Sequence, residues 1–189
     1  MATTTGIHIK RKDVDFESGG MTALGEFEVL VGIPEEKTER KNVEGGDEPV
    51  TNAMIAFIQD QGAPEKNIPQ REFMKPGVEN AMEPIVEQLR RGLNAALRDD
   101  LIGVQRAFNS AGIAAQRGIQ NKIKEGVPPP LSDRTLQERA RKGREGAKLE
   151  LERRAAGEEP STDLATPLID TTEMLQSIKY VVRDKGERE

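Results

Sequence analysis

Apolar residues alternate with polar ones in three segments of the chain, and this pattern predicts three short strands. The clearest strand is predicted over 26–33, because every second residue from Phe27 to Ile33 is apolar and would lie on one face. Weaker alternation over 7–16 and the sequence IKYVVR over 178–183 predict two more strands. We therefore expect a small antiparallel sheet built from these three segments.

Apolar residues at spacings of three and four predict two long helices. The stronger pattern covers 76–98, with apolar positions at Val78, Met82, Ile85, Val86, Leu89, Leu93, Ala96 and Leu97. Pro84 lies inside this stretch, so a kink or a restart is expected near Glu83. A second helix is predicted over 99–125, although three glycines interrupt its pattern. Both helices are expected to pack on the sheet.

Three further helices complete the expected secondary structure. One runs to residue 61 from Asn52, which is a suitable capping residue. Another is predicted over 134–156, where many charges surround three leucines, so it needs a packing partner to be stable. The last is predicted over 170–178, because Asp170 and Glu173 resemble a capping box. Residues 63–72, which contain two prolines, are expected to form an irregular turn.

These elements predict an α+β fold, in which a small antiparallel sheet is packed by two or three helices. The core domain is expected to comprise residues 1–126 and 166–189, and residues 127–165 are expected to form an extended loop or helical arm. Hydrophobic residues make up 35% of the chain and charged residues 32%, so the core will be small for this length. We interpret this composition as a compact domain with extended segments that become ordered on assembly.

Charge is distributed unevenly along the chain, whose net charge is -5. Residues 1–70 carry 7 Lys/Arg against 13 Asp/Glu, a balance of −6, whereas residues 134–154 carry 8 Lys/Arg against 4 Asp/Glu, a balance of +4. The two regions are either complementary between copies of the chain or simply two solvated surfaces. Nucleic-acid binding by the basic region is a weaker hypothesis, because no aromatic residues lie among its charges to stack on bases.

The sequence offers little for catalysis or for cofactor binding. It has no cysteine and a single histidine, His8, so thiolate chemistry, a zinc site and a Ser-His-Asp triad lack their residues. Gly20 and Gly25 have the spacing of a phosphate-binding loop, but Glu26 stands where that loop needs lysine. We interpret these glycines as a turn before the first long strand. We expect no enzymatic activity, no metal and no cofactor.

Membrane association is also not expected. No stretch approaches the roughly 20 apolar residues that cross a bilayer. The N-terminus lacks the apolar run of a secretory signal.

Three stretches, at 51–76, 129–143 and 166–182, together resemble the tail-completion, or neck, proteins of tailed phages. In that family, an Asn-Ala-x-Ile-Ala segment precedes a glycine and an Ile-Pro-x-Arg-x-Phe motif, and a Pro-Leu-Ile-Asp-Thr motif precedes a Ser-Ile-x-Tyr strand. The matching residues here are Asn52, Ala53, Ile55, Ala56, Gly62, Ile68, Pro69, Arg71, Phe73, Pro76, Pro167 to Thr171, Ser177, Ile178 and Tyr180. Two positions depart from the pattern, because Asp60 replaces a frequent glutamate and Thr172 replaces a frequent glycine.

The physical interpretation of these motifs is structural. Pro69 biases Ile68 toward extended geometry, which places Arg71 and Phe73 on the same side of the segment. We expect Phe73 to fill the core and Arg71 to pair with a carboxylate, such as Asp60 or Asp170. Ile178 is also expected in the core.

The resemblance implies a non-enzymatic virion protein, made in the host cytoplasm, that completes the tail and joins it to the head. Such a protein forms a ring at the neck, which is expected to be a hexamer because tail tubes are commonly sixfold. Its implied partners are copies of itself and other neck or tail proteins, such as tail-terminator and head-completion (stopper) proteins. DNA would pass through the ring without specific binding.

Arg139, Arg141 and Arg144 are the candidate basic contacts between copies. A morphogenesis factor absent from the mature virion, or a DNA-binding accessory protein, remains an alternative.

Overall fold

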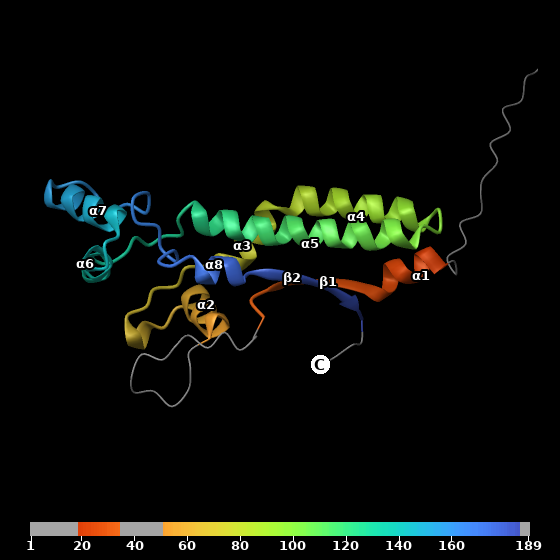
Figure 1. Cartoon of the computed structure of the whole chain (residues 1–189), viewed down its shortest axis with the longest axis horizontal. Helices are drawn as coiled ribbons and strands as arrows, with labels where there is room; N and C mark the ends of the chain where they lie inside the picture. The colour runs from red at the N-terminus through yellow and green to blue at the C-terminus, as the bar shows by residue number, and fades with distance from the viewer. Residues whose placement is uncertain (1–18, 35–50, 186–189) are drawn as a thin grey trace, which may run out of the picture.

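The computed structural model describes residues 19–34 and 51–185, and the α+β class expected from the sequence is confirmed. Within these residues it contains eight α-helices and a two-stranded antiparallel sheet. Helices account for 61% of the described residues, so the sheet is a minor element. The molecule is elongated, with α1 (Gly19–Glu26) near one end and two arm helices near the other (Figure 1).

The sheet pairs two strands from opposite ends of the sequence. Strand β1 (Phe27–Gly32) lies antiparallel to β2 (Lys179–Asp184), with Val29 opposite Val182. The strands predicted over 26–33 and 178–183 are therefore confirmed within a residue or so at their ends. The third expected strand, over 7–16, lies outside the described residues.

A helical hairpin packs against this sheet. Helix α3 (Met74–Asn80) leads into α4 (Met82–Ala96), and α4 packs against the 24-residue helix α5 (Leu101–Lys124), which also contacts both strands. The break between α3 and α4 is at Ala81, close to the interruption predicted near Glu83. The prediction of two long helices is correct, but it is α5 that lies against the sheet, and α4 packs mainly on α5.

Two glycines inside α5 allow close packing without interrupting the helix. A Cβ added at Gly112 would lie 2.3 Å from the Tyr180 ring of β2, and one at Gly118 would lie 2.3 Å from the backbone oxygen of Gly77 in α3. Such approaches are possible only because glycine has no side chain. The glycines that weaken the helical pattern in the sequence therefore mark the places where a strand and a second helix lie against α5.

Two apolar clusters lie along α5. The larger one contains the buried residues Phe73, Ile119, Ile123 and Ile178, together with residues of α2 (Asn52–Gln61) and α8 (Glu173–Ser177). In the second, the Phe27 ring meets the Phe108 ring edge-on, with centroids 5.7 Å apart. The first cluster confirms that Phe73 and Ile178 are core residues.

Helix α1 (Gly19–Glu26) differs from the turn that its glycines predict. The Gly20 amide donates a 2.6 Å hydrogen bond to Asp99 Oδ1, and a Cβ at Gly20 would lie 2.5 Å from the Ala96 backbone oxygen. Gly20 thus permits α1 to lie directly against the end of α4. The helix is set by this long-range contact, which a local pattern does not reveal.

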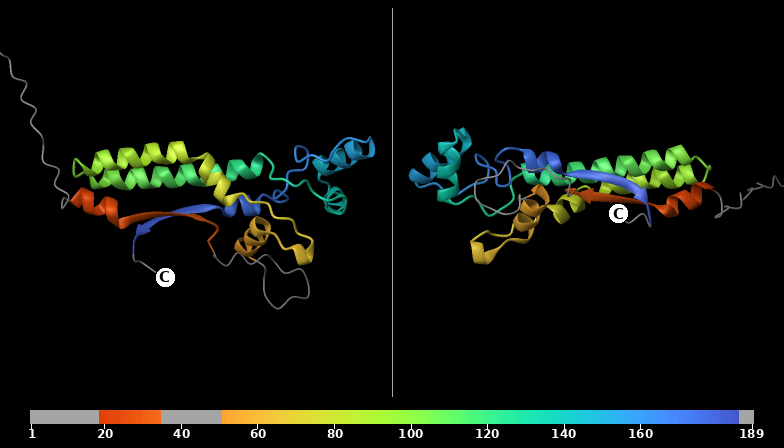
Figure 2. Two further views of the ribbon diagram at one scale, coloured as in Figure 1. Left: turned by 180° about the vertical axis from the view of Figure 1, so that it is seen from behind. Right: turned by 60° about the horizontal axis from the view of Figure 1, so that its bottom comes forward.

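The arm also differs from the prediction. The single helix expected over 134–156 is instead two helices, α6 (Asp133–Arg141) and α7 (Glu145–Ala155), separated at Gly143, whose φ is 81°. They enclose a cluster of their own, made of Leu131, Leu136, Ala147 and Ala165. Two views from other directions also show the arm projecting beyond the end of α5 (Figure 2). Of the three leucines in the predicted helix, Leu136 is buried in this core, Leu151 packs against it and Leu149 is 48% exposed.

Helix ends account for two further corrections. The α2 helix is capped by Thr51, whose Oγ1 accepts a 3.1 Å hydrogen bond from the Met54 amide, and not by Asn52. Helix α8 is preceded by Thr172 in a left-handed conformation, with no side-chain cap, so the capping box proposed for Asp170 and Glu173 does not form. Between α2 and α3, the short 3-10 helix η1 (Pro64–Lys66) lies in the predicted irregular turn.

Candidate docking cleft

A cleft of about 860 Å³ lies where three separate segments meet. These segments are α2 with its following loop, the entry to α6, and the chain just before α8. The lining residues are Ile55, Gln59, Gln61, Gly62, Pro64, Asn67, Ile68, Pro69, Gln70, Arg71, Pro130, Leu131, Ser132, Thr135, Arg139, Leu168, Asp170, Thr171, Thr172 and Met174. The cleft falls within the size range of ordinary ligand sites. Each of its three borders comes from one of the stretches that resemble the neck proteins.

Arg71 crosses from one border of the cleft to another. Its Nε donates to the Pro129 carbonyl at 3.1 Å, its Nη2 to the Pro130 carbonyl at 3.4 Å, and its Nη1 to Gln59 Oε1 at 3.4 Å. The residue is 6% exposed. The pairing predicted with Asp60 or Asp170 is therefore wrong, because the guanidinium is used to hold the chain entering the arm.

Asp60 instead fixes the start of α3. Its Oδ1 accepts hydrogen bonds from the Phe73 amide at 3.0 Å and the Met74 amide at 3.1 Å. Those amides begin a helix and have no partner within it, so a carboxylate there satisfies them and favours the helix dipole. Asp60 thereby holds Phe73 at the position from which its ring enters the core.

Arg139 forms the other basic part of the cleft. Its Nη1 donates to the carbonyls of Thr166 at 3.0 Å and Ile169 at 2.8 Å, which ties α6 to the segment before α8. Asp170, beside it, accepts from Arg144 Nε at 3.1 Å and lies 3.7 Å from Lys142 Nζ. Arg139, Lys142 and Arg144 are thus engaged with their own chain.

Burial is the main influence on the pKa values of both cleft arginines. Burial lowers the pKa of Arg71, and the neighbouring charge of Arg139 lowers it further. Burial also lowers the pKa of Arg139; Asp170 opposes this effect and Arg144 adds to it. Burial alone would raise the pKa of Asp170, but the Arg144 hydrogen bond and the charges of Arg139 and Lys142 together hold it below its usual value.

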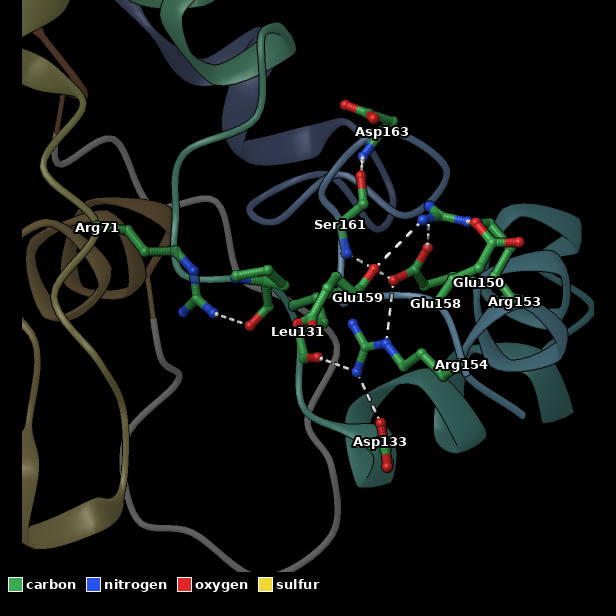
Figure 3. Close-up of polar contacts among 11 residues, drawn as sticks. Arg71, Leu131, Asp133, Glu150, Arg153, Arg154, Glu158, Glu159, Ser161 and Asp163 are labelled. Carbon is green, nitrogen blue, oxygen red and sulfur yellow. Dashed lines mark hydrogen bonds and ion pairs between the residues drawn. The ribbon is translucent and has the colours of Figure 1, made fainter. Parts of the chain in front are cut away.

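A buried carboxylate, Glu150, organises the arm (Figure 3). Its side chain is fully buried, and it accepts from Arg153 Nη1 at 3.1 Å, from Arg154 Nε at 3.0 Å and from the Ser161 amide at 2.8 Å. Arg154 continues to the Leu131 carbonyl and to Asp133 Oδ1. From the sequence, these residues are predicted only as charged positions. The signal that could have shown their pairing is the spacing of Glu150 to Arg153 and Arg154, which places the three on one helix face.

The remaining predicted residues occupy varied positions. Ile68 is half-buried and Pro69 exposed, and both line the cleft. Asn52 is buried at the start of α2, so it is not an exposed contact residue. Tyr180 is half-buried, and its hydroxyl donates to Asn109 Oδ1 at 3.4 Å. Arg141 is exposed on α6 and does not line the cleft.

Within residues 19–34 and 51–185, no group of three His, Cys, Asp or Glu side chains is arranged to hold a metal ion. His8 lies outside these ranges. No helix in the described part of the chain has the length and apolarity needed to cross a membrane. No protein-family model, curated protein or solved structure matches this chain.

Proposed function

We propose that this chain is a non-enzymatic structural protein of a tailed-phage particle, which completes the tail and joins it to the head as part of a ring at the neck. The observation that carries the proposal is the convergence of the three resembling stretches on one cleft. They lie far apart in the sequence, yet Arg71, Arg139 and Asp170 come together there. If the three stretches come from one protein family, they should belong to one structural unit, and here they form a single cleft.

The roles of the motif residues support a structural task. Phe73 and Ile178 fill the core, Asp60 starts a helix, and Arg71 and Arg139 hold backbone carbonyls. These interactions position segments of chain, and the polar side chains make their hydrogen bonds within the protein itself.

An exposed apolar stripe on α4 supports association with another protein surface. Its members recur at spacings of three and four, so they lie on one side of the helix. They are Met82 (47% exposed), Val86 (37%), Leu89 (37%), Leu93 (42%) and Leu97 (48%). A contiguous apolar surface of this kind marks an interaction site in a soluble protein. In a ring, this surface would be covered by the neighbouring copy.

A closed ring needs a heterologous contact, in which one surface of a copy meets a different surface of the next. The α4 stripe supplies one apolar surface for such a contact. The resemblance favours a hexamer, with tail-terminator and stopper proteins as axial neighbours. The acidic balance of residues 1–70 suits a lumen that repels the phosphates of passing DNA.

Two measurements on purified phage particles test this proposal. We expect mass spectrometry to detect the chain in mature virions and a cryo-EM map of the neck to contain a ring into which it can be traced. If the chain is present during assembly but missing from virions, it is a morphogenesis factor. If it is present but the traced neck rings exclude it, its place at the joint is wrong.

A DNA-binding accessory protein is a weaker candidate. Arg139, Arg144, Arg153 and Arg154 already bind oxygens of their own chain, which leaves fewer cations for phosphates. A gel-shift series over increasing salt tests it, because phosphate contacts give a steep loss of affinity with salt. We expect no retention of DNA at physiological ionic strength.

A further inference from the structure

The docking cleft carries an excess of positive charge that its own residues do not balance. Among its lining residues, the charged ones are Arg71, Arg139 and Asp170. The hydrogen bonds of Arg71 to described residues all go to neutral oxygens, and those of Arg139 go to two backbone carbonyls. Asp170 is shared with Arg144 and Lys142, which add two more positive charges beside the cleft.

Such an arrangement favours an incoming carboxylate. Largely buried guanidinium groups gain most from a charged acceptor, because neutral carbonyls satisfy their hydrogen bonds without compensating their charge. The planar fork of arginine also matches a carboxylate in geometry. The ligand chemistry that the charges select is therefore acidic.

The shape and walls of the cleft favour a peptide over a simple anion. Its volume of about 860 Å³ far exceeds the space that one carboxylate needs. Apolar side chains line much of it, including Ile55, Ile68, Pro130, Leu168 and Met174. A peptide can place an acidic side chain against the arginines while neighbouring apolar groups contact these walls.

We propose that the docking cleft receives residues 35–48 of a second copy of this chain. That segment carries six acidic and three basic residues, a balance of −3, so its charge complements the cleft. The inference rests on the proposed ring, since a segment of one copy entering the cleft of the next is a heterologous contact. It also gives the acidic first part of the sequence a specific basic acceptor.

A peptide-binding measurement tests the chemistry. The probe is a fluorescein-labelled peptide of residues 35–50, titrated by anisotropy with the full chain. The full chain used in this titration has the six acidic residues of 35–48 neutralised, so that its own segments do not compete with the peptide. The replacements are E35Q, E36Q, E39Q, E44Q, D47N and E48Q. We expect saturable binding that weakens as ionic strength rises. A peptide with the same six replacements should bind at least tenfold more weakly. Equal binding of the two peptides would show that the apolar walls alone act, and would overturn the inference.

Substitutions at Gln70, an exposed lining residue, tie this binding to the cleft. We expect Gln70→Glu to weaken peptide binding about fivefold, the size of one exposed charge contact, and Gln70→Lys to strengthen it. Gln105→Glu, on the exposed surface of α5 and outside the cleft lining, is the matched control and should leave affinity unchanged. If both Gln70 variants bind like the control, the peptide binds elsewhere and the assignment is wrong.

Mixing two defective chains tests whether the segment comes from a second copy. The Gln70→Glu chain retains an acidic segment but has an impaired cleft, and the neutralised chain has the opposite defect. We expect the neutralised chain alone to sediment as a monomer, and the mixture to form mixed pairs about fivefold more tightly than the Gln70→Glu chain associates with itself. No pair at about 100 μM, well above a micromolar dissociation constant, would overturn exchange between copies. Detection of the chain in virions does not depend on this outcome, so a failed inference and a failed functional proposal are distinguishable.

Discussion

Phe73 and Ile178 are the side chains on which the core at one end of α5 depends. Both are fully buried and belong to the same cluster. We expect Phe73→Ala and Ile178→Ala each to lower the free energy of unfolding by about 2–5 kcal/mol, through lost burial and the cavity left behind. Urea unfolding checks this. Val181→Ala, at an exposed position of the same strand as Tyr180, is the control and should change it little. Unchanged midpoints for both core variants would contradict their assignment.

Sequence reasoning located these two residues but not the partner of Arg71. Apolar alternation and motif position indicate burial, because every apolar side chain in a core gains from leaving water. They do not indicate where a long side chain ends. Arg71 reaches Pro129 and Pro130, which are 58 and 59 positions away, and nothing in the local sequence selects those carbonyls over the nearer Asp60.

Asp170 makes the cleft sensitive to acid. Its pKa is held below the usual value of 3.8, so its ion pairs stabilise the folded state above that value and are lost as pH falls through the folded pKa. We therefore expect Asp170→Asn to be less stable than wild type at pH 7, with the difference shrinking below about pH 4. Urea unfolding at several pH values measures it. Asp184→Asn, exposed at the end of β2, is the matched control. A difference that persists undiminished at pH 2 would mean that the charge of Asp170 is not the cause.

At the scale of elements, helix α7 depends on one buried carboxylate. Replacing Glu150 by alanine removes the acceptor shared by Arg153, Arg154 and the Ser161 amide. Breaking a buried ion pair on one side typically costs about 3–5 kcal/mol, because the partner charge is left uncompensated. We expect Glu150→Ala to increase amide exchange across α6 and α7 while α5 stays protected. Glu152→Ala, on the exposed side of the same helix, should leave exchange unchanged. Uniform loss of protection would show that the arm and core unfold together.

The elements that sequence reasoning identified best are those with a repeating apolar pattern. Helices α3 and α4 taken together, helix α5 and the two strands follow such patterns, and the sequence predicts each within a few residues. Helix α1 and the division of the arm were missed for different reasons. The first depends on contact of Gly20 with the end of α4, and the second on Gly143, which adopts a positive φ between two helices whose apolar residues face each other. Neither feature repeats along the chain, so neither produces a periodic pattern in the sequence.

At the scale of the whole molecule, the charge imbalance in the sequence overstates what the basic region offers to a neighbour. Arg139 and Arg144 hold the segment before α8, and Arg153 and Arg154 hold Glu150. Reversing Arg139, Arg141 and Arg144 together would therefore damage the fold as well as any contact between copies. Arg141 alone is exposed among these three without a hydrogen bond or ion pair to the described residues, so Arg141→Glu is the cleaner test.

If the chain forms a neck ring, its apolar surface should matter more for assembly than its exposed charge. One exposed ion pair contributes about 0–1 kcal/mol, whereas covering the exposed part of Leu93, which is 42% exposed, contributes about 1 kcal/mol, and the stripe has five such side chains. We expect Leu93→Glu to lower the free energy of unfolding by no more than about 2 kcal/mol, which leaves the chain folded, yet to prevent head–tail joining. Arg141→Glu should reduce joining only a few-fold.

Asn94→Glu adds the same charge about 100° around α4 from Leu93 and should assemble normally. Infectious titre, together with counts of free heads and tails by electron microscopy, measures joining. Normal joining by Leu93→Glu would show that this side of α4 is not the lateral contact, and a complete block by Arg141→Glu would show that charge, not apolar burial, holds the copies together.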